Sequence, residues 1–340
     1  MMTLGFTYDL RDDYLAQGFS AEDAAEFDSQ VTIDAIELAL QQYGCFNVEK
    51  IGNIKALTAA LAAGKNWDIV FNICEGVKGI GREAQVPALL EAYGIPCVFS
   101  SSDVMVLTMN KALAKLVVKS RGIPTAPFAV IETKADLATI DLAFPVFAKP
   151  LAEGTGKGIS KKSMVYDKAS LEQICAEITK KFSQPTLVET YLPGRDLTVG
   201  IVGSADQART IAVMETYYQA GAEPGSQSLY NKENWKKVLS YAVVEDETAK
   251  AAADIALRSW RALGCLDGGR VDLRCDEQGI PNFLEVNTIA GLQPFYSDLP
   301  MLCGLVGIEH TELIHLIMDS ALQRHGLSIN RKISQTSSVQ

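Results

Sequence analysis

Hydrophobic and polar residues alternate in blocks along roughly the first 100 residues. An apolar run at 4–8 predicts a short strand, and a longer run at 68–74 predicts a buried strand. Stretches with helical periodicity predict three helices, at about 20–43, 54–63 and 83–93, followed by a strand at 97–99. Strands that alternate with helices are typical of a parallel sheet, whose ligands bind in loops after the strands' carboxyl ends. The loops after Tyr8 and Cys74 are therefore candidate sites.

The pattern changes after about residue 127, where short strands follow one another. They are predicted at 128–131, 146–149, 159–165, 186–190, 197–203, 208–215, 269–275 and 281–287. Helices are predicted at about 102–121, 168–182, 245–263 and 311–325. The stretch at about 217–241 has no regular period, which in a compact domain usually marks a functional or disordered loop. The tail after Gly326 is expected to be frayed.

Composition and charge place the chain among globular proteins. It has 340 residues, 48% hydrophobic and 21% charged, which predicts two domains or three lobes around one site. Lys and Arg number 31 against 41 Asp and Glu, a net charge of −10. This balance argues against a general binder of nucleic acid or of an anionic membrane, because both need a basic surface. A small anionic ligand held by a few cations stays compatible with it.

Cysteine and histidine usage narrows the chemistry further. Seven cysteines without a CxxC motif indicate reduced, mostly buried thiols and a cytoplasmic protein. The three histidines, His310, His315 and His325, all lie near the C-terminus, which disfavours a histidine-dependent hydrolase or a zinc site. No signal sequence and no apolar run of about 18 residues is evident, so no membrane span is expected. We expect the chemistry to use Lys, Arg, Asp and Glu.

The strongest cluster of charged residues lies in the last two predicted strands. Arg270 and Asp272 share one face of a strand, and so do Glu285 and Asn287. The turn at 276–279 would join the strands as a hairpin and bring Asp272 near Glu285. Oxygen ligands on neighbouring strands suit Mg²⁺. The alternative is an ordinary solvated sheet face.

A cationic, glycine-rich segment forms the second cluster. Lys149 ends an apolar run, and Glu153, Gly154, Thr155, Gly156, Lys157 and Gly158 follow it. Alternating glycines let backbone N–H groups approach phosphate oxygens closely. The segment is not a Walker A motif, because no GK[ST] ends it and no helix is predicted after it. A flexible hairpin turn is the alternative interpretation.

The order of these motifs resembles the ATP-grasp superfamily, most closely its D-alanine–D-alanine ligase branch. The matching stretches are Met109-Asn110-Lys111, the Lys149 strand with its glycine-rich loop, 187–196, 270–272 and 284–288. The resemblance extends to about residue 325. It implies an ATP-grasp fold of mixed α/β and α+β class. Its parts would be an N-terminal parallel α/β lobe (1–101), a central lid subdomain (102–191), a C-terminal subdomain with the metal site (192–326) and a flexible tail (327–340).

The resemblance also implies a nucleotide site. Glu189 would accept a hydrogen bond from the adenine amino group, Asp196 would hold the ribose, and Lys232 would cover the nucleotide from the long loop. The residues implied to contact ATP are Lys111, Lys149, Glu153, Gly154, Thr155, Gly156, Gly158, Glu189, Thr190, Tyr191, Leu192, Asp196 and Lys232.

The implied reaction is ATP-dependent amide formation through an acyl phosphate, with release of ADP. Asp272, Glu285 and Asn287 would bind two Mg²⁺ ions, with Mn²⁺ as a second candidate. Arg270 and the backbone near Gly291 would stabilise the charge on the reacting carboxylate, and Lys232 would assist.

The substrate half departs from the family pattern. Glu26 partly matches the family's first substrate motif, and Glu75 stands where the ligases have histidine. Lys78 or Arg82 could compensate this negative charge, or Arg82 could simply pair with Glu75 and fix the loop. Ser297 could bind the second substrate's carboxylate. We therefore expect amino-acid-like substrates, with D-alanine one candidate and a secondary-metabolite ligase another.

Two other functions stay open at this stage. One is a non-catalytic nucleotide-binding protein, and the other is an ATP-grasp kinase that stops at the phosphorylated product. Many members of the family are homodimers, and a homodimer stays open for this chain, although its sequence shows no dimer surface.

Overall fold

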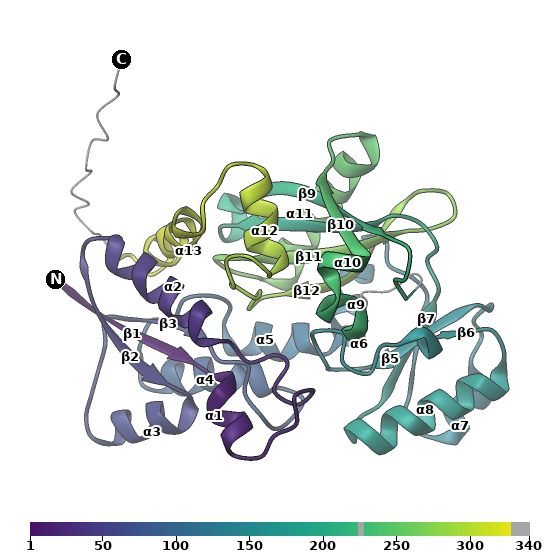
Figure 1. Cartoon of the computed structure of the whole chain (residues 1–340), viewed down its shortest axis with the longest axis horizontal. Coiled ribbons are helices and arrows are strands. Elements are labelled where there is room, and N and C mark those ends of the chain that lie inside the picture. Colours follow the sequence, from purple (N-terminus) through teal and green to yellow (C-terminus); the bar gives the residue numbers. More distant parts are fainter. Residues whose placement is uncertain (224–227, 328–340) are drawn as a thin grey trace.

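The computed structural model describes residues 1–223 and 228–327, and its chain forms three lobes around a central region (Figure 1). The first lobe contains a parallel sheet with strand order β2-β1-β3, which confirms the predicted parallel sheet. Its elements are β1 (Met2–Tyr8), α1 (Arg11–Ala16), α2 (Gln30–Gln42), β2 (Phe46–Gly52), α3 (Ile54–Ala62), β3 (Ile69–Ile73), η1 (Arg82–Ala84) and α4 (Gln85–Ala92).

The helix predicted at 20–43 is shorter than expected, because α2 begins at Gln30. Upstream, Asp28 forms a parallel bridge with Leu10: the Asp28 N–H donates to the Asp9 carbonyl at 3.1 Å. This extended backbone cannot continue a helix. The Ser29 hydroxyl then caps α2 by accepting from the Thr32 N–H at 3.4 Å. The segment before α2 is thus free to line a cavity.

Two other details of this half differ from the prediction. Strand β2 was not predicted, because Asn47, Glu49 and Lys50 interrupt its apolar pattern at the edge of the sheet. The segment at 97–99 forms only an isolated bridge between Cys97 and Val70.

The helix predicted at 102–121 is two helices, α5 (Ser102–Met109) and α6 (Lys111–Ser120). Asn110 separates them and caps α6, since its side chain accepts from the Leu113 N–H at 3.1 Å. The break places Lys111 at the first position of α6, beside the carbonyl of Glu153.

The second lobe is an antiparallel sheet with strand order β4-β7-β5-β6. The strand predicted at 159–165 is reduced to two residues, because the turn at 161–163 precedes it. The elements are β4 (Phe128–Ile131), α7 (Lys134–Thr139), β5 (Val146–Pro150), η2 (Lys161–Ser163), β6 (Met164–Val165), α8 (Lys168–Phe182) and β7 (Thr186–Thr190).

The third lobe contains a five-stranded antiparallel sheet, β10-β9-β8-β11-β12. Strand β10 and two short helices occupy part of the stretch that was predicted to be irregular, of which 224–227 lie outside the described residues. The elements are β8 (Asp196–Val202), η3 (Ala205–Gln207), β9 (Arg209–Tyr218), α9 (Leu229–Glu233), α10 (Trp235–Val238), β10 (Leu239–Val243), α11 (Glu247–Leu263), β11 (Gly268–Cys275), β12 (Pro281–Asn287), α12 (Asp298–Leu305) and α13 (His310–Arg324).

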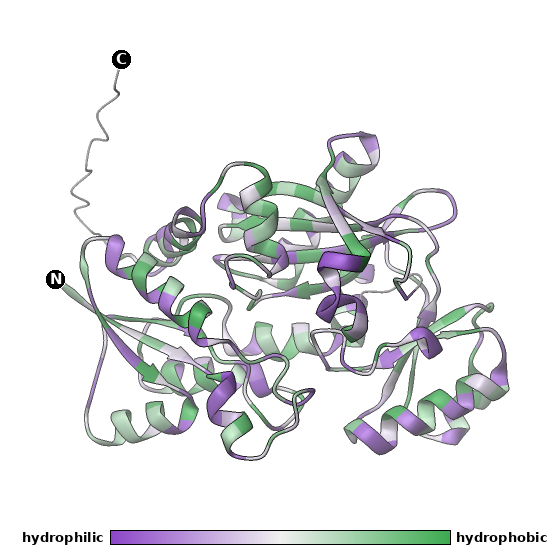
Figure 2. Cartoon of the chain, in the orientation of Figure 1, coloured by the Kyte–Doolittle hydropathy of each residue, from purple (hydrophilic) through white to green (hydrophobic). Residues whose placement is uncertain are grey.

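Shared hydrophobic cores join the lobes. Leu313 and Ile317 of α13 are buried in one cluster with Leu4 and Ile33 of the first lobe, so the end of the chain returns to its beginning. Helices α5 and α6 contribute to the core around Trp260 of α11. Hydrophobic residues lie on strands and helices alike, and the short helices α9 and α10 carry several hydrophilic residues (Figure 2). The division of the chain at 102, 192 and 327 stays a prediction, and the predicted tail lies from 328 onward outside the described residues.

The cysteine and histidine side chains are part of the packing of the protein. No disulfide joins any of the seven cysteines, and five of them are buried, as predicted. The ring nitrogens of His310, His315 and His325 contact backbone carbonyls at 2.8, 2.9 and 3.1 Å. In the part of the chain that the structure describes, no single helix is long and apolar enough to span a membrane, although α12 and α13 together meet this criterion with a bend of 109°.

Candidate functional site

Two adjoining cavities of about 290 and 100 Å³, called here the large and the small cavity, contain most of the predicted site residues. A separate cavity of about 440 Å³ lies between the first and second lobes. The large cavity is bounded by the loop before α2, the loop after β3, the glycine-rich loop and the segment after β12. The small cavity is bounded by β5, β7, β8, β11 and β12. Glu285 lines both and marks the place where they meet.

Most of the predicted site residues line these cavities. In the large cavity they are Glu26, Glu75, Lys111, Glu153, Gly154, Thr155, Arg270, Glu285, Asn287, Gly291 and Ser297. In the small cavity they are Lys149, Gly156, Glu189, Thr190, Tyr191, Leu192, Asp196, Lys232, Asp272 and Glu285. Gly158 and Arg82 line neither cavity: a Cβ on Gly158 would meet Pro150 Cγ at 2.5 Å, so Gly158 permits close packing of the loop.

The hairpin of β11 and β12 places the predicted metal ligands together. Asp272 pairs directly with Glu285, and Arg270 pairs with Asn287, as the sequence pattern predicted. The turn between the strands is closed by Asp276, whose carboxylate accepts from the Ile280 N–H at 2.9 Å. All four polar side chains therefore lie on adjacent strands at the centre of the site.

Asp272 is fully hydrogen-bonded. Its carboxylate accepts from Arg270 at 2.7 and 2.9 Å, from the Thr198 hydroxyl at 2.9 Å and from the Asn287 amide at 3.1 Å. Arg270 also pairs with Asp298 at 2.9 Å. Burial raises the pKa of Asp272 to about 6, although the Arg270 guanidinium opposes the shift.

Glu285 is more accessible than Asp272. Its side chain is 28% exposed, and its ion pair, with Lys111, is long at 3.5 Å. Burial alone would raise the pKa of Glu285, but Lys111 and Lys149 outweigh it and lower this pKa to about 2. An ionised carboxylate with spare lone pairs, beside a second carboxylate and an amide oxygen, is a donor set that suits a hard divalent cation.

A buried ion triad borders the small cavity, which two of its members line. Glu189 pairs with both Lys115 and Lys149 at 2.9 Å, and all three side chains are at most 6% exposed. Burial would raise the pKa of Glu189, but the two lysines lower it to about 2. Lys115 was not predicted as a site residue. It follows Lys111 by four residues on α6, so helical spacing alone could have indicated that the two share a face.

The rest of the small cavity combines apolar walls with polar side chains. Phe147 and Leu284 are among its apolar walls, and the chain after β7 passes along it at 190–192. Tyr218 donates to the carboxylate of Asp196, a buried residue that lines the cavity. Arg274, which was not predicted, stacks over the Tyr191 ring at 5.3 Å from its centroid. Such a slot has the shape and polarity to hold a flat ring with polar edges.

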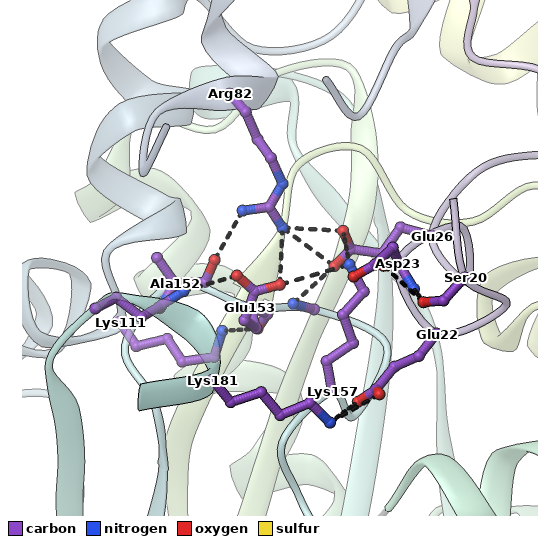
Figure 3. Close-up of polar contacts among 12 residues, drawn as sticks. Ser20, Glu22, Asp23, Glu26, Arg82, Lys111, Ala152, Glu153, Lys157 and Lys181 are labelled. Atoms are coloured by element: carbon purple, nitrogen blue, oxygen red, sulfur yellow. Dashed lines mark hydrogen bonds and ion pairs between the residues drawn. The ribbon is translucent and has the colours of Figure 1, made fainter. Parts of the chain in front are cut away.

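The glycine-rich loop is tied to the first lobe by a buried network (Figure 3). Glu26 accepts from Arg82 at 3.0 Å, from Lys157 at 2.9 Å and from the Gly154 N–H at 2.8 Å. Arg82 also donates to the Ala152 carbonyl at 2.9 Å. A Cβ on Gly154 would lie 2.7 Å from Glu26 Oε1, so glycine permits this approach. Glu26 and Arg82 thus hold the loop, and their predicted contact with substrate stays a prediction.

We expect Glu26→Gln to weaken binding at the glycine-rich loop. The amide keeps the shape but removes the charge that faces Arg82 and Lys157, and charge-assisted hydrogen bonds are worth roughly 1.5–3 kcal/mol each. The KM for ATP should rise about tenfold or more. Steady-state kinetics with varied ATP would measure this.

Glu22→Gln is the matched control, because Glu22 pairs with Lys181 between the same two lobes but at the surface. Exposed pairs contribute about 0–1 kcal/mol, so the control should leave the KM for ATP nearly unchanged. Equal effects of the two substitutions would contradict the role given to Glu26.

The wall of the large cavity contributed by the first lobe contains residues that the sequence did not single out. They are Arg11, Asp28 and Glu83, and they line the cavity with Glu75. Burial raises the pKa of Asp28 and of Glu83 to about 7. Glu75 forms no ion pair with Arg82, whose partners are Glu26 and Glu153, but the Arg82 guanidinium opposes the rise of the Glu75 pKa and so offsets part of its charge.

Opposite this wall, Ser297 accepts from the Gln293 N–H at 3.2 Å and lies beside Gly291. A Cβ on Gly291 would approach Ser297 Oγ to 2.7 Å, so glycine permits the close approach of Ser297, and both residues line the cavity. Lys232 lies on α9 and lines the small cavity. The Tyr296 hydroxyl donates to the backbone carbonyl of Lys232 at 3.4 Å.

Sequence comparison identifies relatives over most of the chain. The family described as "D-ala D-ala ligase C-terminus" matches residues 117–319. A D-alanine–D-alanine ligase of Bordetella petrii is 30% identical over 279 residues, which cover 80% of this chain and 82% of that protein. An uncharacterised protein of Sinorhizobium fredii is 31% identical over 270 residues, covering 76% of this chain and 75% of that protein.

Structural comparison agrees with the sequence relatives. The ATP complex of D-alanine–D-alanine ligase from Bacillus anthracis superposes with a TM-score of 0.70 at 21% identity, covering 96% of this chain and 99% of that one. VanG D-Ala:D-Ser ligase from Enterococcus faecalis gives 0.70 at 18%, covering 94% and 99%. These likenesses show the ATP-grasp fold. The chain therefore belongs to the D-alanine–D-alanine ligase family and is an ATP-dependent ligase that forms carbon–nitrogen bonds.

Proposed function

We propose that the protein joins the carboxylate of one amino-acid-like substrate to the amine of another in the large cavity, with ATP bound in the small cavity. The observation that carries this proposal is the position of Glu285, which lines both cavities. A side chain there can act on the nucleotide phosphates and on the reacting carboxylate together. Membership of the family supports the class of reaction, and the two adjoining cavities support the proposed positions of ATP and of the amino-acid-like substrates.

The small cavity suits an adenine nucleotide. Apolar side chains such as Phe147 and Leu284 would contact the base, and the backbone at 190–192 would read its edge. Asp196 would accept from the ribose hydroxyls. Lys149, whose charge is maintained by Glu189, would face the phosphates, and the backbone N–H groups of the glycine-rich loop would complete their coordination.

The residues present also fit a divalent cation. Asp272, Glu285 and Asn287 would hold Mg²⁺, with Mn²⁺ as the second candidate, because all three offer oxygen donors on adjacent strands. A bound Mg²⁺ would offset the repulsion between the nucleotide phosphates and the reacting carboxylate. Arg270 already neutralises Asp272 in the described structure, so its guanidinium would turn toward the substrate when the cation is bound.

In the proposed reaction, a carboxylate oxygen of the first substrate bonds to the γ-phosphorus, the bond to the β–γ bridging oxygen breaks, and ADP leaves. The amine nitrogen of the second substrate then bonds to the acyl carbon, phosphate leaves, and the nitrogen loses a proton. Arg270 and the backbone near Gly291 would stabilise the negative charge that develops on the acyl oxygen. Closure of the glycine-rich loop by Glu26 would exclude water from the acyl phosphate.

The test is ADP release with ATP, Mg²⁺ and a panel of amino acids of both configurations, including D-alanine, with the product mass measured. We expect at least one pair of amino acids to stimulate ADP release and to give an amide with the mass of the two substrates minus water.

Two results would overturn the proposal. ADP release with a phosphorylated acid as the final product would indicate a kinase. ATP binding in calorimetry without any amine-dependent turnover would indicate a nucleotide-binding protein.

A further inference from the structure

Arg11 is a cation in the large cavity with no partner among the described residues. It lies at the start of α1, its guanidinium makes no hydrogen bond or ion pair there, and its Nε is buried without a hydrogen-bond partner. A buried guanidinium nitrogen left unpaired is costly, and a carboxylate is the group that matches its planar donors best. Arg11 therefore points to an anionic group of a ligand.

The position of Arg11 separates it from the other charges of the cavity. Burial raises the pKa of the Tyr296 hydroxyl, and Arg11 opposes this, so the guanidinium lies near Tyr296, next to Ser297. Arg270 and Lys111, the other cations of the cavity, already pair with Asp272 and Glu285. Arg11 is thus the free cation of the described lining, away from the carboxylate that would react.

Three carboxylates in the same cavity also lack an ion pair within the described part of the chain: Asp28, Glu75 and Glu83, called here the acidic wall. The remaining acids that line the cavity, Glu26, Glu153 and Glu285, each pair with a lysine or an arginine. Burial, together with repulsion from Glu83, Glu26 and Asp28, raises the pKa of Glu75 well above its usual range, although Arg82 opposes this shift.

Neither a metal nor the surrounding protein accounts for the acidic wall. Among the described residues, no three His, Cys, Asp or Glu side chains are placed to hold a metal ion. The nearby Arg82 is committed to Glu26 and Glu153, and Lys78 is exposed. The side chains of the cavity that lack an ion pair among the described residues are therefore three acids and Arg11. Amide formation consumes the carboxylate of one amino acid and the amine of the other. Two amino acids with neutral side chains would therefore leave one ammonium and one carboxylate to face these side chains.

We propose that one of the two amino acids joined by this ligase carries a second amino group, which the acidic wall binds, and that Arg11 binds the carboxylate that does not react. The substrate class is a diamino acid, such as 2,3-diaminopropionate, ornithine or lysine. One of the two ammonium groups would then face the acidic wall and favour the ionised form of its carboxyl groups, and the carboxylate would face Arg11. This inference rests on the proposed function and names the substrates of the same site.

The experiment compares each diamino acid with its neutral isostere in amine-dependent ADP release: diaminopropionate with 2-aminobutyrate, ornithine with norvaline, and lysine with norleucine, in both configurations. We expect kcat/KM to favour one diamino acid by roughly 10- to 100-fold, the value of one charge-assisted hydrogen bond. Glu75→Gln should reduce this preference by about tenfold or more and leave the KM for ATP unchanged.

Arg11→Gln should raise the KM for the substrate whose carboxylate it binds, while the substrate's α-carboxamide, which lacks that charge, should be unaffected by the substitution. Asp12→Asn is the matched control, because Asp12 is exposed on the same helix and does not line the cavity. Circular dichroism would check that each variant is folded.

Equal use of diamino acids and their isosteres by the unmodified protein, or an unchanged preference in Glu75→Gln, would overturn this inference while leaving the ligase assignment intact. Absence of turnover with every amino acid would instead count against the proposed function itself.

Discussion

Glu285→Ala is expected to remove turnover while leaving the fold intact. The side chain lies where the two cavities meet and is 28% exposed, and among the described residues its ion-pair partner is Lys111 at 3.5 Å. Its loss should therefore cost little stability. Removing a single charged group that acts on the developing charge of a transition state typically lowers the rate by about 10²–10³-fold. A further loss of Mg²⁺ affinity would add to this.

ADP release at saturating ATP would measure the rate, and the melting temperature by circular dichroism would report the fold. Glu277→Ala is the control, because Glu277 is an exposed carboxylate in the turn of the same hairpin. Calorimetry with a non-hydrolysable ATP analogue and Mg²⁺ would show independently of turnover whether cation-dependent binding is lost. Retained activity in Glu285→Ala would remove Glu285 from the site.

The centre of the site could be predicted because its geometry is local. In a hairpin, a spacing of two residues along each strand and a short turn between the strands fix which side chains face each other. The sequence at 270–287 contains all of this information, and Asp272 does lie opposite Glu285.

The unpredicted parts of the site depend on contacts between distant segments. Glu26 meets Lys157 across 131 residues, and Lys115 contacts the carbonyl of Phe283 across 168. No local pattern encodes which of the many charged residues will be buried by such packing. Arg11 was missed for a related reason: it lies in a polar segment that reads as a loop, and only the bridge between Leu10 and Asp28 turns that segment into a cavity wall.

Glu189 shows how burial can give a predicted ligand-binding residue a structural role as well. Glu189 was expected to meet adenine, and it lines the small cavity, but both of its oxygens already pair with lysines. A carboxylate has about four lone-pair sites, so it can accept from a ligand as well. The structure therefore gives Glu189 a second task, which is to keep Lys115 and Lys149 charged inside the protein. This task has a large energetic consequence.

Glu189→Gln is expected to lower the free energy of unfolding by roughly 3 kcal/mol. The lowering of the Glu189 pKa from its usual 4.5 to about 2 corresponds to a stabilisation of about that size at neutral pH. Removal of one member of a buried ion pair typically costs about 3–5 kcal/mol, because the partner charge is left uncompensated. Burial already lowers the pKa of Lys115, so without Glu189 this lysine should lose its proton more readily.

Urea unfolding followed by circular dichroism would measure the difference, with Glu172→Gln as the control. Glu172 pairs with Lys134 in the same lobe at 2.6 Å, but the two side chains are 51% and 84% exposed, so this pair should contribute about 0–1 kcal/mol. The advantage of Glu189 should be complete above about pH 4.5, its usual pKa in an unfolded chain, and should disappear as the pH falls toward 2. Equal stability of the two variants at neutral pH would show that the buried lysines do not depend on Glu189.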